Sequence, residues 1–95
     1  MYRTIVEEHA FVQDLDSLAK DYPRIYDVKD AVSWELSKRP LAGTAVFGYH
    51  QWRLYNTFQV GITPVFTILY SYDEQKDPNT VRLFGVRAAD KVRDE

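Results

Sequence analysis

The spacing of the apolar residues changes along this 95-residue chain and limits what it can fold into. After a short opening run typical of a strand, apolar side chains recur at steps of three and four between His9 and Pro40, and beyond Pro40 the pattern is that of strands. Steps of three and four place side chains on one face of a helix, whereas alternation places them on one face of a strand. The sequence therefore predicts an α+β fold in which a strand precedes a helical segment and further strands follow it.

A proline divides the helical segment into two amphipathic helices. The two apolar stripes consist of Phe11, Leu15, Leu18 and Tyr22, and of Ile25, Val28, Val32 and Leu36. Pro23 is tolerated in the first turn of a helix, so we expect it to open the second helix, which ends before Pro40. The two helices are expected to form a hairpin.

Four segments have the β-branched and aromatic composition of strands. They are residues 2–8, 45–58, 64–73 and 80–87, and turn-forming residues occupy 61–64 and 73–79. The expected order is β-α-α-β-β-β, with the last three strands forming an antiparallel meander. Because so small a sheet needs one covering layer, the helical hairpin should pack on one face of a small antiparallel sheet and leave the other face free.

Side-chain alternation predicts which strand residues face the helices. The side chains expected in the core are Trp52, Leu54, Phe66, Ile68, Tyr70, Phe84 and Val86. Those expected on the free face are Tyr49, Gln51, Arg53, Tyr55, Thr67, Leu69, Ser71, Leu83, Gly85 and Arg87.

The composition excludes several classes of function. The chain has no cysteine, and its two histidines lack metal-ligand spacing, so we expect no metal and no cofactor. The N-terminus is too acidic for a signal peptide, and no apolar run approaches the roughly 18 residues that span a bilayer. We therefore expect a cytoplasmic protein, made of a single domain over residues 1–95, that does not contact a membrane.

The net charge of −2 conceals an uneven distribution. Residues 38–72 carry three basic side chains and no acidic one, whereas residues 1–37 carry eight acidic and four basic side chains. The middle of the chain is thus locally positive, which suits an anionic partner. The acidic first third is either a solvated helix surface or a landing site for a basic segment of a partner protein.

Four stretches of the sequence carry a resemblance to a known family: WELSKRPLAG, QWRLY, FTILYSYD and VRLFGV. With the β-α-α-β-β-β order, they resemble the RelE/ParE toxin superfamily of bacterial type II toxin-antitoxin systems over nearly the whole chain. The resemblance implies that members similar to RelE cleave messenger RNA in the ribosomal A site without a metal, and that members similar to ParE poison DNA gyrase. In both branches a cognate antitoxin wraps the toxin and neutralises it.

The resemblance also assigns site residues. The paired basic residues of the family's second strand fall at Gln51 and Arg53, the arginine of its third strand falls at Thr67, and Arg87 stands close to the position of a last-strand arginine. In this interpretation Arg53 and Arg87 are the catalytic cations that bind phosphate, since guanidinium binds phosphate oxygens in a bidentate fork.

The tyrosines of the same strand complete this interpretation, in which Tyr49, Gln51 and Tyr55 bind RNA because tyrosines can stack on nucleobases. The family's terminal tyrosine or histidine, its usual acid or base, has no match in AADKVRDE. Arg53 and the tyrosines could equally be ordinary surface residues of a sheet.

We therefore predict a toxin that inhibits translation by ribosome-dependent mRNA cleavage, as a metal-independent endoribonuclease. Its expected partners are a cognate antitoxin, the ribosome and mRNA. Two alternatives stay open: a ParE-like DNA gyrase inhibitor without nuclease activity, which Thr67 and the missing C-terminal groups favour, and a degenerate member that only binds its antitoxin. A homodimer through an exposed sheet edge, or a hetero-oligomer with the antitoxin, is compatible with the sequence.

Overall fold

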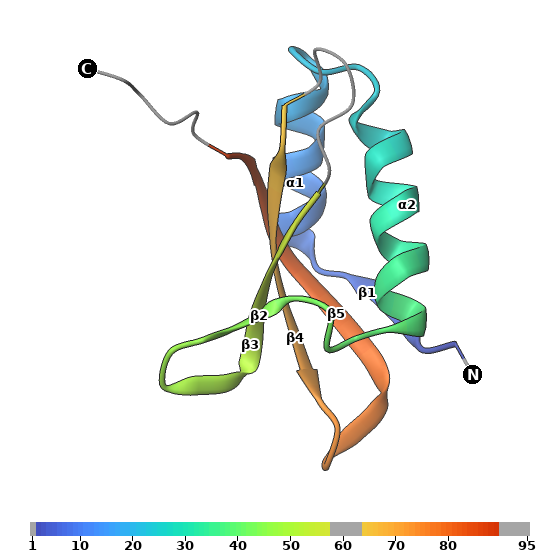
Figure 1. Cartoon of the computed structure of the whole chain (residues 1–95). Helices are drawn as coiled ribbons and strands as arrows, with labels where there is room; N and C mark the ends of the chain where they lie inside the picture. The colour runs from blue at the N-terminus through green and yellow to red at the C-terminus, as the bar shows by residue number, and fades with distance from the viewer. Residues whose placement is uncertain (1, 58–63, 90–95) are drawn as a thin grey trace.

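The computed structural model describes residues 2–57 and 64–89. Its elements are β1 (Thr4–Glu7), α1 (His9–Ala19), α2 (Ile25–Lys38), β2 (Thr44–Val46), β3 (Tyr49–Asn56), β4 (Phe66–Asp73) and β5 (Asp77–Ala88). The strands form one mixed sheet in the order β1-β5-β4-β3-β2, and both helices lie on the same face of it (Figure 1). The predicted α+β class and the predicted meander of β3, β4 and β5 are confirmed. One pairing is parallel, that of β1 with β5, so the sheet is mixed rather than antiparallel throughout.

The helices form where the two apolar stripes predict them. Phe11 and Leu15 of α1, and Ile25, Val32 and Leu36 of α2, are buried against the sheet. Pro23 lies in the turn before α2 rather than in its first turn. A hydrogen bond of 2.9 Å from the amide of Ile25, the first residue of α2, to the carbonyl of Tyr22 closes this turn. Within the described ranges neither helix is long and apolar enough to cross a membrane.

The segment predicted as one strand over 45–58 is instead a hairpin. Thr44–Val46 forms β2, which pairs antiparallel with β3 (Tyr49–Asn56). Gly48 in the connection has a φ of 82°, a left-handed conformation that glycine adopts without steric cost. Of the turn predicted at 61–64, residues 61–63 lie outside the described residues. The turn after β4 is shorter than predicted, because β5 begins at Asp77.

The core lies between the helices and one face of the sheet, and Phe66, Ile68 and Tyr70 are buried there as predicted. The alternation predicted for β5 is wrong in part. Leu69 pairs with Gly85 and Tyr70 with Leu83, so a β-bulge places an extra residue, Phe84, between them. Leu83 is therefore buried, and Phe84 is only partly buried.

A hydrogen-bond network fixes the linker that leaves α2 onto the sheet. The Tyr70 hydroxyl donates to the Pro40 carbonyl over 2.7 Å and accepts from the Gly43 amide over 2.8 Å. The Arg53 guanidinium donates to the carbonyls of Gly43 over 3.0 Å and Leu41 over 3.3 Å. A Cβ atom at Gly43 would stand 2.7 Å from both the Leu54 carbonyl oxygen and the Tyr70 hydroxyl, so only glycine fits.

Gly43→Ala is expected to lower the free energy of unfolding by about 1–3 kcal/mol, because the methyl group would force the linker off the sheet. Urea denaturation followed by circular dichroism measures the loss. Gly85→Ala is the matched control, since its Cβ would meet a side-chain oxygen of Asp14 at 3.3 Å rather than backbone. Equal losses of unfolding free energy for the two variants would show that the close backbone contact at Gly43 does not make this glycine necessary.

Tyr70→Phe should cost about 1–3 kcal/mol, because it leaves two buried backbone groups without a partner. Burial raises the pKa of Tyr70 above the ordinary tyrosine value, although the Gly43 amide and the charge of Arg53 oppose the rise. The unfolded chain therefore loses the Tyr70 proton at lower pH than the folded chain. The contribution of the Tyr70 hydroxyl to the free energy of unfolding is complete below about pH 10 and is lost as the pH rises through the pKa of the folded state. The stability difference between wild type and Tyr70→Phe should stay constant up to that pH and shrink above it, as urea titrations over alkaline pH would show.

Candidate functional site

From Trp52 to Tyr55, the two sides of β3 are the reverse of the predicted ones. Arg53 pairs across the sheet with Tyr70, and Tyr55 pairs with Ile68. Since directly opposed residues share a face, Arg53 and Tyr55 lie on the helix-covered side with the core. Trp52 and Leu54, predicted in the core, lie on the uncovered face.

The reversal has a physical cause in the backbone of the linker. The carbonyls of Leu41 and Gly43 need a donor, and the Arg53 guanidinium supplies it while its aliphatic stem crosses the sheet. Trp52 instead packs on Phe84 across the other face, with ring centroids 4.7 Å apart. Ranking side chains by hydrophobicity therefore assigned β3 to the wrong faces.

The structure does not bring the predicted site residues together. Arg87 pairs with Thr67 and is exposed on the uncovered face, as predicted, so it lies across the sheet from Arg53. Gln51 lines a hollow of about 400 Å³ together with Arg53. Tyr49 is 61% exposed and lines a separate hollow on the uncovered side. Arg53 and Arg87 therefore lie on opposite faces of the sheet, and the catalytic and RNA-binding roles of these residues stay predictions.

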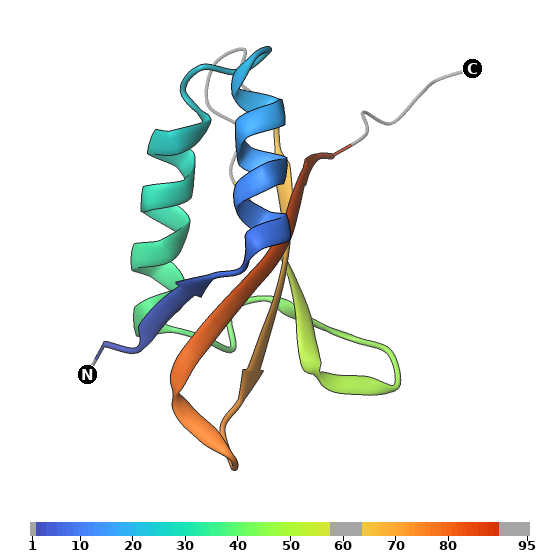
Figure 2. The ribbon, with the colours of Figure 1, turned by 180° about the vertical axis from the view of Figure 1, so that it is seen from behind.

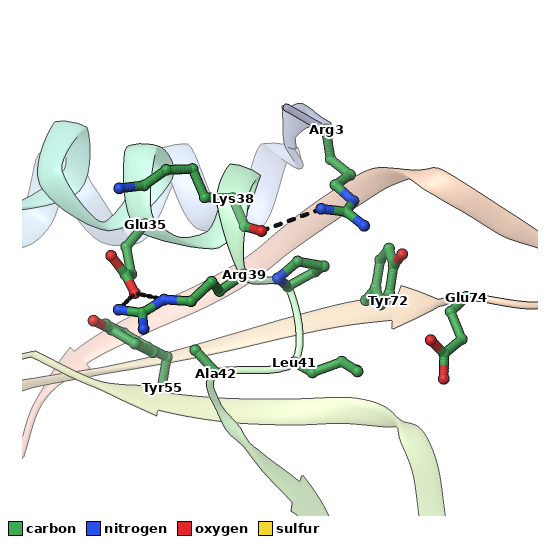
Figure 3. A pocket seen from close by; sticks show the side chains of 10 residues that line it. Arg3, Glu35, Lys38, Arg39, Leu41, Ala42, Tyr55, Tyr72 and Glu74 are labelled. Atoms are coloured by element: carbon green, nitrogen blue, oxygen red, sulfur yellow. Dashed lines mark hydrogen bonds and ion pairs between the residues drawn. The ribbon is translucent and has the colours of Figure 1, made fainter. Parts of the chain in front are cut away.

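A cleft of about 710 Å³ opens between the C-terminal end of α2 and the sheet (Figure 3). We call it the α2 cleft, and its charged and phenolic lining consists of Arg3, Glu35, Lys38, Arg39, Tyr55, Tyr72 and Glu74. The linker Pro40–Ala42 forms part of its wall, so the Tyr70 and Arg53 network shapes this cleft.

Two cations of the α2 cleft are held without a carboxylate. Arg3 donates to the carbonyls of Lys38 over 3.1 Å and Pro78 over 3.4 Å. The Lys38 ammonium lies 4.8 Å from the ring centroid of Trp34. In residues 2–57 and 64–89 neither side chain has an ion-pair partner, so both positive charges are available to an anion.

A carboxylate, a guanidinium and a phenol share one wall of the α2 cleft. Glu35 and Arg39 form an ion pair one helical turn apart, and Figure 3 shows the Tyr55 hydroxyl beside them. Burial raises the pKa of Tyr55, the negative charge of Glu35 raises it further, and Arg39 opposes the rise. Tyr55 therefore keeps its proton at neutral pH and can donate it.

Sequence reasoning missed most of this cleft. Its residues come from the chain just before β1, the last turn of α2 and the linker after it, strands β3 and β4, and the turn after β4, and only the fold brings these segments together. The one signal in the sequence was the positive segment that begins at Lys38 and Arg39. No group of three or more histidine and carboxylate side chains in the described part of the chain is arranged to hold a metal ion.

The fold is similar to that of a solved structure, although the sequence alone finds no relative. The sequence matches no known protein-family model and no curated protein. Its structure matches a chain of the RelBE2 toxin-antitoxin complex from Mycobacterium tuberculosis with a TM-score of 0.67 and 20% sequence identity, over 94% of this chain and 100% of that chain. The fold is RelE-like. The architecture that the resemblance implied is thereby confirmed, and the α2 cleft and the uncovered face are two opposite surfaces of this RelE-like fold.

Arg53→Lys tests what the arginine does in this RelE-like fold. Lysine cannot reach two carbonyls with a planar fork, so the free energy of unfolding should fall by about 1.5–3 kcal/mol. Arg82→Lys is the control, because Arg82 makes an exposed ion pair with Glu8 that lysine can keep. Urea denaturation of both variants gives the comparison. If Arg53→Lys unfolds like wild type, the linker does not depend on this guanidinium.

Proposed function

We propose that this chain is the toxin of a type II toxin-antitoxin system in the RelE/ParE superfamily. The proposal rests on the RelE-like fold and on the four sequence stretches that resemble the superfamily. A structure with the same fold is that of a toxin-antitoxin complex, which supports a cognate antitoxin as the protein partner.

The α2 cleft carries the proposal about the target, which is RNA bound at the ribosome. The lining carries three cations, Arg3, Lys38 and Arg39, against two carboxylates, Glu35 and Glu74, so it is positive although the whole chain is negative. Such a lining would bind the phosphates of a single strand. Gln51 and Arg53 line the adjoining hollow and would extend the path of the strand.

The α2 cleft also holds the three kinds of group that metal-free RNA cleavage needs. Glu35 would take the proton of the ribose 2′-hydroxyl, whose oxygen then attacks phosphorus. Arg39 would stabilise the negative charge that develops on the phosphorane. Tyr55 would give its proton to the 5′-oxygen as the bond from phosphorus to that oxygen breaks, which leaves a 2′,3′-cyclic phosphate.

A gyrase-directed toxin is the second candidate, and one observation favours it. The uncovered face of the sheet presents aromatic and aliphatic side chains, which suit a protein surface better than a nucleic acid. This activity would need none of the groups in the α2 cleft.

Glu35→Gln and Arg39→Ala distinguish the two candidates. After induction of the wild-type chain, amino-acid incorporation should fall before thymidine incorporation, and primer extension should show new mRNA ends. Each substitution should slow cleavage by about a hundredfold or more, since it removes a proton acceptor or a charge partner of the transition state.

Arg24→Ala is the matched control for these variants. Arg24 forms a similar exposed ion pair on α2, with Asp27 at 3.3 Å, and lies far from the cleft. It should leave cleavage unchanged. Earlier loss of thymidine incorporation would instead identify replication as the target, and normal growth with a binding antitoxin would identify a degenerate member.

A further inference from the structure

Two exposed aromatic side chains stack on each other beside the α2 cleft. The ring centroids of Tyr2 and Trp34 lie 4.9 Å apart, and the two ring planes meet at 32°. Tyr2 is 61% exposed and Trp34 is 55% exposed, so their contact leaves ring surface open to water. Single exposed aromatic residues are common on proteins, but a stacked pair with this much open surface suits a planar ligand. We call Tyr2 and Trp34 the aromatic pair.

The aromatic pair shares its neighbouring cations with the α2 cleft. Lys38 lines the cleft, and its ammonium lies 4.8 Å from the Trp34 ring centroid. Arg3 also lines the cleft and directly follows Tyr2 in the chain (Figure 3). A strand whose phosphates lie on these two cations would therefore have a base within reach of the pair.

Backbone contacts hold the two rings in place before any ligand binds. β1 begins beside the C-terminal end of α2 (Figures 1 and 2). Ser37 joins these two segments, because its carbonyl accepts from the Arg3 amide over 2.9 Å and its hydroxyl donates to the Trp34 carbonyl over 2.7 Å. The Arg3 guanidinium adds a hydrogen bond to the Lys38 carbonyl over 3.1 Å. A stacking surface fixed in this way loses little conformational entropy when a base binds.

The surroundings of the aromatic pair favour a nucleobase over a partner protein. Asp30 and Lys38 lie one helical turn from Trp34, so the apolar surface does not continue along α2. A stable protein interface needs about 1,000 Å² or more with an apolar centre, whereas one base needs only the area of a ring. The Asp30 carboxylate is paired with Lys29 over 3.1 Å, so it does not cancel the charge of Lys38. Aromatic rings flanked by cations are typical of surfaces that bind single strands.

We propose that the aromatic pair stacks an unpaired base of the single-stranded RNA that lies in the α2 cleft, while Lys38 and Arg3 hold the adjoining phosphates. The identity of this ligand rests on the proposed function. The pair lies outside the groups that carry out cleavage, so it contributes to the binding of the strand and not to the chemical step. Its loss should therefore raise KM for cleavage and leave kcat unchanged.

Fluorescence titration with a short single-stranded RNA tests the stacking directly. The chain has two tryptophans, so Trp52→Phe leaves Trp34 as the only reporter. The RNA should quench the Trp34 emission, whereas the same strand without its bases should bind through its phosphates and leave the emission unchanged. In anisotropy titrations with dye-labelled strands, Tyr2→Leu and Trp34→Leu should each weaken binding of the complete strand by about tenfold. Neither variant should change binding of the strand that lacks bases.

Two further variants separate stacking from a loss of structure. Trp34→Phe keeps a ring at the same place and should retain most of the affinity for the complete strand. Tyr26→Leu is the matched control, since Tyr26 is a 43% exposed aromatic residue on the same helix and does not line the α2 cleft. It should bind both strands like wild type.

Other outcomes separate this inference from the proposed function. If Tyr2→Leu and Trp34→Leu bind the complete strand like wild type, no base stacks on the pair, and the proposed role of the cleft stands. If both variants lose binding while induction of the wild-type chain leaves amino-acid incorporation and mRNA ends unchanged, the stacking site stands and the proposed function fails. If they weaken binding of a co-purifying protein and not of RNA, the pair is a protein-binding surface. Absence of RNA binding even at low salt, where phosphate contacts are strongest, overturns the stacking site.

Discussion

The Tyr70 hydroxyl holds together the two layers of this protein at the point where the chain passes from one to the other. It donates to the Pro40 carbonyl and accepts from the Gly43 amide, so it satisfies both polar groups at the ends of a four-residue stretch. Such buried backbone groups are costly when unpaired. The hydroxyl therefore determines how the helical hairpin meets the sheet, and the absence of a side chain at Gly43 lets the linker approach closely enough.

The same contact gives the molecule its two different surfaces. Because Arg53 must reach the linker carbonyls, β3 turns Arg53 and Tyr55 toward the helices and Trp52 and Leu54 away from them. The linker then forms a wall of the α2 cleft, where Arg3, Lys38 and Arg39 gather. A cationic cleft on one side and an apolar, uncovered sheet face on the other are thus two consequences of one anchoring network.

Local pattern was enough to predict the architecture, since the stripes of α1 and α2 and the composition of β4 depend on neighbours in the sequence. It was not enough for the site. The bulge at Phe84 shifts the alternation of β5, and Gly48 turns one expected strand into the β2–β3 hairpin. The orientation of Arg53 depends on carbonyls ten and twelve residues away, which no count of apolar residues reveals.

Thr67 occupies a position where the superfamily pattern has an arginine, and its place on the sheet gives a physical reason for the difference. It lies on the uncovered face opposite Arg87, and its hydroxyl donates to the Asn56 side chain over 2.7 Å. An arginine there would place a second charge beside the apolar hollow of Leu54 and Leu69. The cations Arg3, Lys38 and Arg39 lie across the sheet, in the α2 cleft. The threonine therefore keeps this part of the uncovered face free of a second charge.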